Sequence, residues 1–164
     1  MKHPERIELA PGYSISRIIT GLWQVADIEK EDGSMDLGPA ASALVDYAES
    51  GFDTFDMADH YGSAELIAGH ARRKMQEHDS ANRPSSQARF HTKWCPKPGE
   101  MTPQKVRDGV LLSAERLDTQ QIDLMQFHWW NYEHPQYLDA MEGLQALKEE
   151  GIIRHLGLTN FDTD

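Results

Sequence analysis

Four side chains in this sequence could together transfer a proton: Asp56, Tyr61, Lys93 and His128. Asp56 lies in an apolar, strand-like stretch, where a carboxylate needs a charged partner. Lys93 can be that partner, because lysine is disfavoured in strands and this one interrupts an aromatic run. An ammonium group beside the Tyr61 phenol would favour the phenolate and lower its pKa. We therefore predict Tyr61 as a general acid, with His128 hydrogen-bonded to a carbonyl oxygen held between them.

Alternating short apolar runs and amphipathic segments are expected to position these residues. Pro11-Gly12 predicts the turn of a hairpin over residues 7–16. The other expected strands are 17–24, the start of 51–62, 89–95, 122–129 and 153–160. The expected helices are 39–50, 63–76, 103–117 and 137–150, and the expected loops are 27–38 and 77–87. The run 17–24 is apolar enough to suit a strand buried on both faces.

Strands that alternate with helices of this length indicate a parallel α/β sheet with right-handed crossovers. Either an open doubly wound sheet or part of a (β/α) barrel would fit. No Gly-x-Gly-x-x-Gly motif follows the first of these strands, which disfavours a Rossmann unit. Functional groups in such folds lie at the carboxyl ends of the strands. The polar or aromatic groups at those ends are Trp23 and Gln24, Asp56 and Tyr61, Lys93 and Trp94, His128 and Trp129, and Thr159 and Asn160.

Composition narrows the classes of partner. The 164 residues suit one domain with an apolar core, and their formal net charge of −11 argues against nucleic-acid binding. The sequence contains no polybasic membrane patch and no run near the roughly 18 apolar residues of a membrane span. Cys95 is the single cysteine, which fits a reducing compartment, and the N-terminus lacks an apolar signal core, so we expect a cytoplasmic protein. No ligand spacing among the histidines indicates a metal site.

Several segments resemble the motifs of the aldo-keto reductase family. They are Gly21-Leu22-Trp23; Asp53-Thr54-Phe55-Asp56 with Ala58-Asp59-His60-Tyr61-Gly62; Thr92-Lys93; Phe127-His128-Trp129; and Gly151-Ile152-Ile153-Arg154 through Gly157-Leu158-Thr159-Asn160-Phe161. That family has an Asp, Tyr, Lys, His tetrad in this order, and all four are present here. The resemblance covers nearly the whole chain and implies a TIM (β/α)8 barrel with a short N-terminal hairpin across its bottom.

The resemblance also implies an activity. It implies an oxidoreductase that transfers a hydride between NADP(H) and a small-molecule carbonyl or alcohol. Tyr61 would protonate the carbonyl oxygen, Lys93 held by Asp56 would lower the phenol pKa, and His128 would orient the carbonyl. The residues it places at the cofactor are Trp23, Asp56, Thr159 and Asn160, of which the last two would hold the nicotinamide carboxamide. The residues it places around an apolar substrate pocket are Trp23, Trp94 and Trp129.

Each candidate also has an ordinary structural explanation. A lone aspartate can cap a turn, a lone lysine can protect an edge strand, and a lone histidine or tyrosine is usually a packed core residue. The joint occurrence of the four at one rim favours the catalytic interpretation. For Trp23 and Trp129, packing in the core remains an equally good explanation.

The number of strands is smaller than the family fold needs. A complete barrel has eight strands and about 250 residues, whereas residues 1–164 provide about five strands. We therefore expect a single incomplete barrel domain, a fragment that lacks the family's phosphate-binding loops and is inactive alone. An open sheet has unpaired edges. The alternative is a non-catalytic half-barrel that self-associates, or binds a partner, through those edges.

Overall fold

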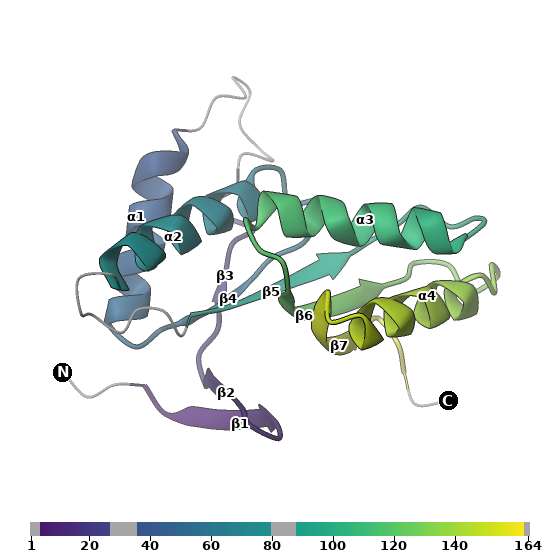
Figure 1. The fold of residues 1–164 in the computed structure, drawn as a ribbon, viewed down its shortest axis with the longest axis horizontal. Coiled ribbons are helices and arrows are strands. Elements are labelled where there is room, and N and C mark those ends of the chain that lie inside the picture. The colour runs from purple at the N-terminus through teal and green to yellow at the C-terminus, as the bar shows by residue number, and fades with distance from the viewer. Residues whose placement is uncertain (1–3, 27–35, 80–87, 163–164) are drawn as a thin grey trace.

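The chain forms a β-hairpin followed by alternating strands and helices, as the computed structural model shows (Figure 1). The structure describes residues 4–26, 36–79 and 88–162. The hairpin strands are β1 (Arg6–Ala10) and β2 (Tyr13–Ser16). The remaining strands are β3 (Thr20–Gly21), β4 (Thr54–Asp56), β5 (Arg89–Trp94), β6 (Ile122–His128) and β7 (Ile153–Thr159). The helices are α1 (Leu37–Glu49), α2 (Ala64–Asp79), α3 (Pro103–Arg116) and α4 (Tyr137–Glu149).

The five later strands make one parallel sheet in the order β3-β4-β5-β6-β7. Sequential neighbours are paired, as expected for βα units joined by crossovers. Asp56 ends β4 opposite His91, and Lys93 lies one pleat further along β5 opposite Gln126. The α/β class, the parallel sheet and the N-terminal hairpin predicted from the sequence are confirmed.

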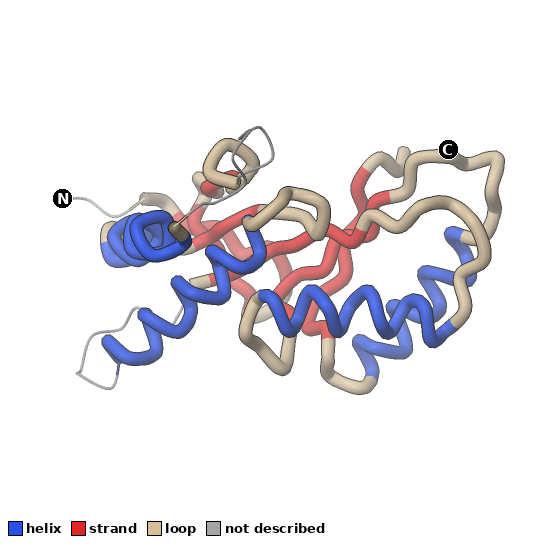
Figure 2. The backbone as a smooth tube through the Cα atoms, turned by 90° about the horizontal axis from the view of Figure 1, so that it is seen from above, coloured by secondary structure: helices blue, strands red, loops and turns tan. Residues whose placement is uncertain are grey.

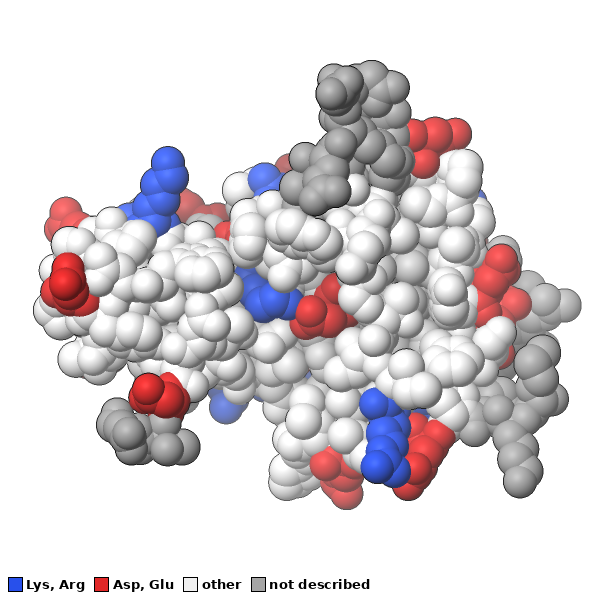
Figure 3. Space-filling model, turned by 180° about the vertical axis from the view of Figure 1, so that it is seen from behind, with Lys and Arg blue, Asp and Glu red and all other residues white. Residues whose placement is uncertain are grey.

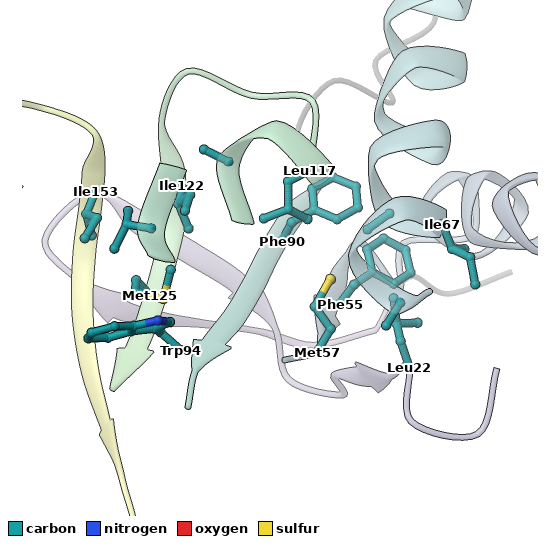
Figure 4. Packing of buried hydrophobic residues seen from close by; sticks show 14 of the residues in the cluster. Leu22, Phe55, Met57, Ile67, Phe90, Trp94, Leu117, Ile122, Met125 and Ile153 are labelled. Carbon is teal, nitrogen blue, oxygen red and sulfur yellow. The ribbon is translucent and has the colours of Figure 1, made fainter. Parts of the chain in front are cut away.

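The hydrophobic core lies between one face of the sheet and the helices. Figure 2 shows α2, α3 and α4 on the same side of the strands. Phe55, Phe90 and Met125 project from the sheet into this layer, where Ile67 and Leu117 meet them (Figure 4). Strand residues alternate between faces, so their neighbours along each strand point to the opposite face. No helix of the described residues covers that face, which we call the helix-free face.

Local sequence signals account for the helix ends. The Asp36 side chain accepts a hydrogen bond from Gly38 N and caps α1, and Thr102 caps α3 in the same way through Lys105 N. Gly51 and Gly151 follow α1 and α4 with φ of 91° and 83°, which favours glycine after a helix.

The strand predicted over residues 17–24 is largely wrong. Only Thr20–Gly21 forms β3, and Ile18 is 60 % exposed. The segment lies at the edge of the sheet, where Leu22 is buried but Ile18, Ile19 and Trp23 are exposed. Two predicted loops are also shorter than expected. Helix α1 begins within the predicted loop 27–38, and α2 ends within the predicted loop 77–87. Residues 27–35 and 80–87 of those loops lie outside the described part of the chain.

The sheet is open at both ends within the described residues, with β3 and β7 as its edge strands. A groove of about 610 Å³ lies between α4 and β7, lined chiefly by apolar residues that include Phe127, Leu144 and Leu158. Figure 3 shows the side opposite the view of Figure 1, where charged side chains are scattered among wide uncharged areas. None of the helices in 4–26, 36–79 and 88–162 has the length and apolar character needed to cross a membrane.

Candidate active site

An ion pair joins the ends of β4 and β5 on the helix-free face. The Lys93 ammonium donates to Asp56 Oδ2 at 2.6 Å and to the Met57 carbonyl oxygen at 2.8 Å. The Lys93 side chain is 9 % exposed and that of Asp56 is 33 % exposed. Removing a lysine this far from water is costly without an acceptor of opposite charge. The partner that the sequence required for Asp56 is therefore Lys93.

Gln126 of β6 extends this pair across the sheet. Its Nε2 donates to Asp56 Oδ1 at 2.9 Å, and its Oε1 accepts from the Thr159 hydroxyl at 3.4 Å. Both carboxylate oxygens of Asp56 thus have a donor. We did not identify Gln126 from the sequence, although its position two residues before His128 on the same strand places both on one face.

Tyr61 lies in the loop between β4 and α2, beside the ion pair. Its ring centre is 4.6 Å from that of Trp23 in an edge-to-face contact and 4.9 Å from that of His60. Lys93 Nζ lies 5.3 Å from the centre of the Tyr61 ring. The loop is tied to β5, because Asp59 N donates to the Lys93 carbonyl oxygen at 2.9 Å.

The expected lowering of the Tyr61 pKa is wrong for this arrangement. Burial raises the pKa of the Tyr61 phenol above its ordinary value of 10, and the negative charge of Asp56 adds to the rise, as does Cys95. The positive charge of Lys93 is balanced by Asp56 at 2.6 Å, and the ammonium lies over the ring. Tyr61 is therefore protonated at neutral pH and available as a proton donor.

A buried cluster on the helix side supports the Tyr61 loop. Glu65 of α2 is 1 % exposed and accepts from the Thr92 hydroxyl at 2.6 Å. Arg116 of α3 donates to Glu65 Oε2 at 3.3 Å and to the Asp59 carbonyl oxygen at 3.2 Å. Arg116 therefore connects α2, α3 and the loop that carries Tyr61.

His128 ends β6 at the same rim. Its Nε2 is 2.8 Å from the Asn160 side-chain amide, and its ring centre is 4.1 Å from that of Trp130. Nδ1 is buried and has no hydrogen-bond partner within the described part of the chain. Burial lowers the pKa of His128 below 6.5, and the positive charges of His60 and Lys93 act in the same direction. The imidazole is neutral at neutral pH, with one N–H to donate.

The four tryptophans divide between the rim and the core. Trp94 and Trp129 are 5 % and 0 % exposed and belong to the hydrophobic core. Figure 4 shows Trp94 there, and its ring stacks on that of Phe127. Trp23 and Trp130 are 41 % and 59 % exposed and contact Tyr61 and His128 respectively. These placements leave Trp94 and Trp129 away from the four polar candidates.

Strand alternation could have indicated this division. Adjacent residues on a strand point to opposite faces, so Trp94 lies on the other face of the sheet from Lys93, and Trp129 on the other face from His128. By the same alternation Trp130, which the sequence interpretation did not use, shares the side of His128. Core packing, which we left open for Trp129, is the arrangement in the structure.

Together these groups form a polar site with aromatic walls. Tyr61 is a protonated phenol, His128 a neutral imidazole and Lys93–Asp56 a fixed ion pair. Thr159 and Asn160 place a hydroxyl and an amide at the end of the neighbouring strand β7. Such a set can bind a polar oxygen by hydrogen bonds and give it a proton.

The known proteins that this chain resembles are aldo-keto reductases. The model of the aldo/keto reductase family matches residues 17–164. An aldo-keto reductase of Mycobacterium sp. (strain MCS) is 28 % identical over 159 residues, which are 96 % of this chain and 49 % of that protein. The NADH-specific methylglyoxal reductase of Escherichia coli K12 is 25 % identical over 173 residues, covering 92 % of this chain and 50 % of that protein.

Solved structures agree on the fold. An aldo-keto reductase of Klebsiella pneumoniae, in complex with NADP and acetate, superposes with a TM-score of 0.75 at 22 % identity and covers 98 % of this chain and 51 % of that one. A thermostable aldo-keto reductase bound to epalrestat gives a TM-score of 0.78 at 23 % identity, covering 96 % and 54 %. The chain thus spans about half the length of the relatives that it matches, and it belongs to the aldo/keto reductase family.

Proposed function

We propose that this chain holds the proton-transfer half of a carbonyl reductase site that works with NADP(H). The observation that carries the proposal is the meeting of Asp56, Tyr61, Lys93 and His128 at the ends of three adjacent strands and one loop. Membership of the aldo/keto reductase family supports a nicotinamide-linked oxidoreductase. The reaction would reduce a carbonyl to an alcohol, or run in reverse.

The residues at the rim suit the nicotinamide end of the cofactor. The Asn160 amide and the Thr159 hydroxyl offer both a donor and an acceptor to a carboxamide, and the half-exposed Trp23 ring offers an apolar wall. When bound, the reduced nicotinamide would supply the hydride. NADP(H) is favoured by the NADP complex of the Klebsiella relative, whereas an E. coli relative is NADH-specific.

The chain's own residues would handle the oxygen of the substrate. Tyr61 would give its phenolic proton to the carbonyl oxygen, so its O–H bond breaks as the alcohol O–H bond forms, and solvent would return the proton. A ring N–H of His128 would donate to the same oxygen and fix its direction. The Asn160 amide nitrogen lies 2.8 Å from Nε2 of His128 and can only donate to it. The amide would therefore turn away, and the ring proton would move to Nε2, before a carbonyl binds there. Trp130 and Trp23 would exclude water from the two sides.

Nicotinamide fluorescence tests cofactor binding directly. Against the expectation from the sequence that the fragment is inactive alone, the proposal predicts saturable binding of NADPH or NADH to the 164-residue chain. It also predicts hydride transfer to methylglyoxal as a first carbonyl, since two E. coli relatives are methylglyoxal reductases. Tyr61→Phe should retain binding and lose about 100-fold or more in reduction. Tyr47→Phe, an exposed tyrosine on α1, is the matched control and should change neither. Unaltered reduction by Tyr61→Phe would refute the mechanism.

A second candidate function is a non-catalytic half-barrel that pairs with another copy of itself. The groove between α4 and β7 and the open edge of β7 favour it, because they present apolar side chains beside unpaired strand groups. The opposite edge, near β3, exposes Ile18 and Ile19, so the two edges can meet. Leu158→Asp should then convert a dimer to a monomer in sedimentation equilibrium. A chain that is monomeric without this change excludes the candidate.

A further inference from the structure

Gln126 occupies the centre of the polar row on the helix-free face. It is opposite Lys93 on one side and Gly157 on the other. A Cβ atom added to Gly157 would lie 3.3 Å from Gln126 Cγ, so the glycine leaves the space that the glutamine side chain fills. Gln126 is therefore packed between two strands, with its amide directed toward Asp56.

The Gln126 amide holds the Asp56 carboxylate through the oxygen that Lys93 does not bind. Lys93 holds Oδ2 at 2.6 Å, and Gln126 holds Oδ1 at 2.9 Å. With one donor alone, a partly exposed carboxylate could rotate about its χ2 torsion, which is a broad torsion. With two donors from two different strands the carboxylate plane is set, and the ammonium is held near the Tyr61 ring.

The other end of the same amide reaches β7. Gln126 Oε1 accepts from the Thr159 hydroxyl at 3.4 Å. A single side chain thus connects the ion pair beside the proposed proton donor with the strand end proposed to hold the nicotinamide. A glutamine can do this because it carries a donor and an acceptor on one planar group.

We propose that Gln126 is a positioning residue for the proton donor, which sets the Asp56 carboxylate, and through it Lys93, relative to Tyr61. The proposal rests on the proposed function of the same site. Gln126 acts through Asp56 and would not itself touch the substrate.

The pKa of Tyr61 depends on the position of the Asp56 carboxylate, so it can be used to test the proposal without measuring enzyme activity. The ionisable groups that face Tyr61 are His60 of its own loop, Asp56 of β4, and Lys93 and Cys95 of β5 and its end. Asp56 raises the pKa of the phenol. If Gln126 holds the carboxylate in place, its loss lets the carboxylate turn toward solvent and weakens that effect.

The experiment follows the ζ-carbon NMR signal of labelled tyrosine, assigned by its loss in Tyr61→Phe. Gln126→Met, which keeps the length of the side chain, should lower the Tyr61 midpoint by at least half the shift that Asp56→Asn causes. In the Asp56→Asn background Gln126→Met should add no further shift. Gln126→Asn, which is too short to reach Asp56, should reproduce the result if Gln126→Met does not fold.

Gln104→Leu is the matched control. Gln104 donates to Asp108 at 2.7 Å on the exposed surface of α3, so the same type of amide–carboxylate bond is lost outside the polar row of the sheet. The midpoint of the Tyr61 titration in Gln104→Leu should equal that in the unaltered chain.

The proposal is overturned if Gln126→Met and Gln126→Asn leave the Tyr61 midpoint unchanged, or shift it equally with and without Asp56. It is also overturned if Asp56→Asn leaves the midpoint unchanged. Failure of nicotinamide binding with the expected titration would instead remove the proposed function and leave the positioning intact.

Discussion

Asp56 Oδ2 lies 2.6 Å from Lys93 Nζ, so the carboxylate offsets the effect of the lysine charge on the pKa of the Tyr61 phenol. The ammonium is nonetheless within 5.3 Å of the phenol ring. Without a ligand, the site therefore keeps Tyr61 in its protonated form, because burial and the Asp56 carboxylate both raise its pKa. A proton donor for carbonyl reduction needs this state at the start of the reaction.

We predict that Asp56→Asn lowers the pKa of Tyr61. The substitution removes the negative charge that opposes the phenolate and leaves the positive charge of Lys93 unbalanced nearby. Ultraviolet absorbance of phenolate, with the titration of Tyr61→Phe subtracted, measures the shift. An Asp56→Asn titration that matches the unaltered chain, or lies above it, would contradict the electrostatic description.

We expect His91 to make the stability of the chain decrease toward acid pH. It is 2 % exposed and hydrogen-bonded at 2.9 Å to the hydroxyl of Tyr13, and burial lowers its pKa from 6.5 to about 4. Between these pH values the unfolded chain binds a proton that the folded chain does not. Stability therefore falls as pH falls from about 6.5 to about 4, by up to about 3 kcal/mol at 1.36 kcal/mol per pKa unit.

The measurement is urea unfolding at several pH values across that window. His91→Gln keeps an acceptor for Tyr13 but cannot titrate, so its stability should decline less steeply toward acid than that of the unaltered chain. Carboxylates contribute equally to both proteins, and the difference between the two slopes isolates His91. Equal slopes would show that His91 does not control the acid response.

The charge anomalies were the part of the site most open to prediction. A carboxylate and an ammonium within apolar strands can be recognised from the neighbouring sequence alone. Because each needs a partner of opposite charge, Asp56 led to Lys93, and the structure contains the hydrogen bond between them. The strands that carry these two residues, and all four helices of the described residues, followed from periodicity, turns and caps. These signals are local, so they survive without knowledge of the fold.

Other features depend on three-dimensional contacts. Gln126 is uncharged and ordinary in sequence, and only the pairing of β4, β5, β6 and β7 brings it to Asp56 and Thr159. The sign of the Tyr61 pKa shift depends on burial and on distances that a sequence does not contain. The strand expected over 17–24 was too long because its apolar residues indicated burial on both faces, whereas at the edge of the sheet Ile18 and Ile19 are exposed and only Leu22 is fully buried.

The cluster under the Tyr61 loop gives a prediction about stability. Arg116→Met would leave the carboxylate of Glu65 buried without its cation, and we expect a loss of about 3 kcal/mol. Glu65→Gln added to Arg116→Met should recover at least half of the loss, because a neutral amide can still accept from Thr92. Urea unfolding of the two variants makes the comparison.

The pH dependence of the same variant provides its control. Burial raises the pKa of the Glu65 carboxyl group, so the folded chain binds a proton at Glu65 more tightly than the unfolded chain does. Lowering the pH should therefore reduce the deficit of Arg116→Met relative to the unaltered chain. A double variant no more stable than Arg116→Met, or a deficit that grows with acid, would exclude the buried charge as the cause.

A close approach of α2 and α3 gives the last prediction. A Cβ atom on Gly69 would lie 2.2 Å from the carbonyl oxygen of Arg116, a backbone atom that cannot turn aside. Helix propensity alone would make Gly69→Ala stabilising by about 1 kcal/mol, whereas the overlap should make it destabilising by about 2 kcal/mol. Gly21→Ala, with nothing within 4 Å of the added Cβ, is the matched control and should change stability by about 0.5 kcal/mol or less. Urea midpoints decide between the two signs, and a stabilised Gly69→Ala would mean that α2 does not pack this closely against the end of α3, whose Arg116 connects α2 to the Tyr61 loop.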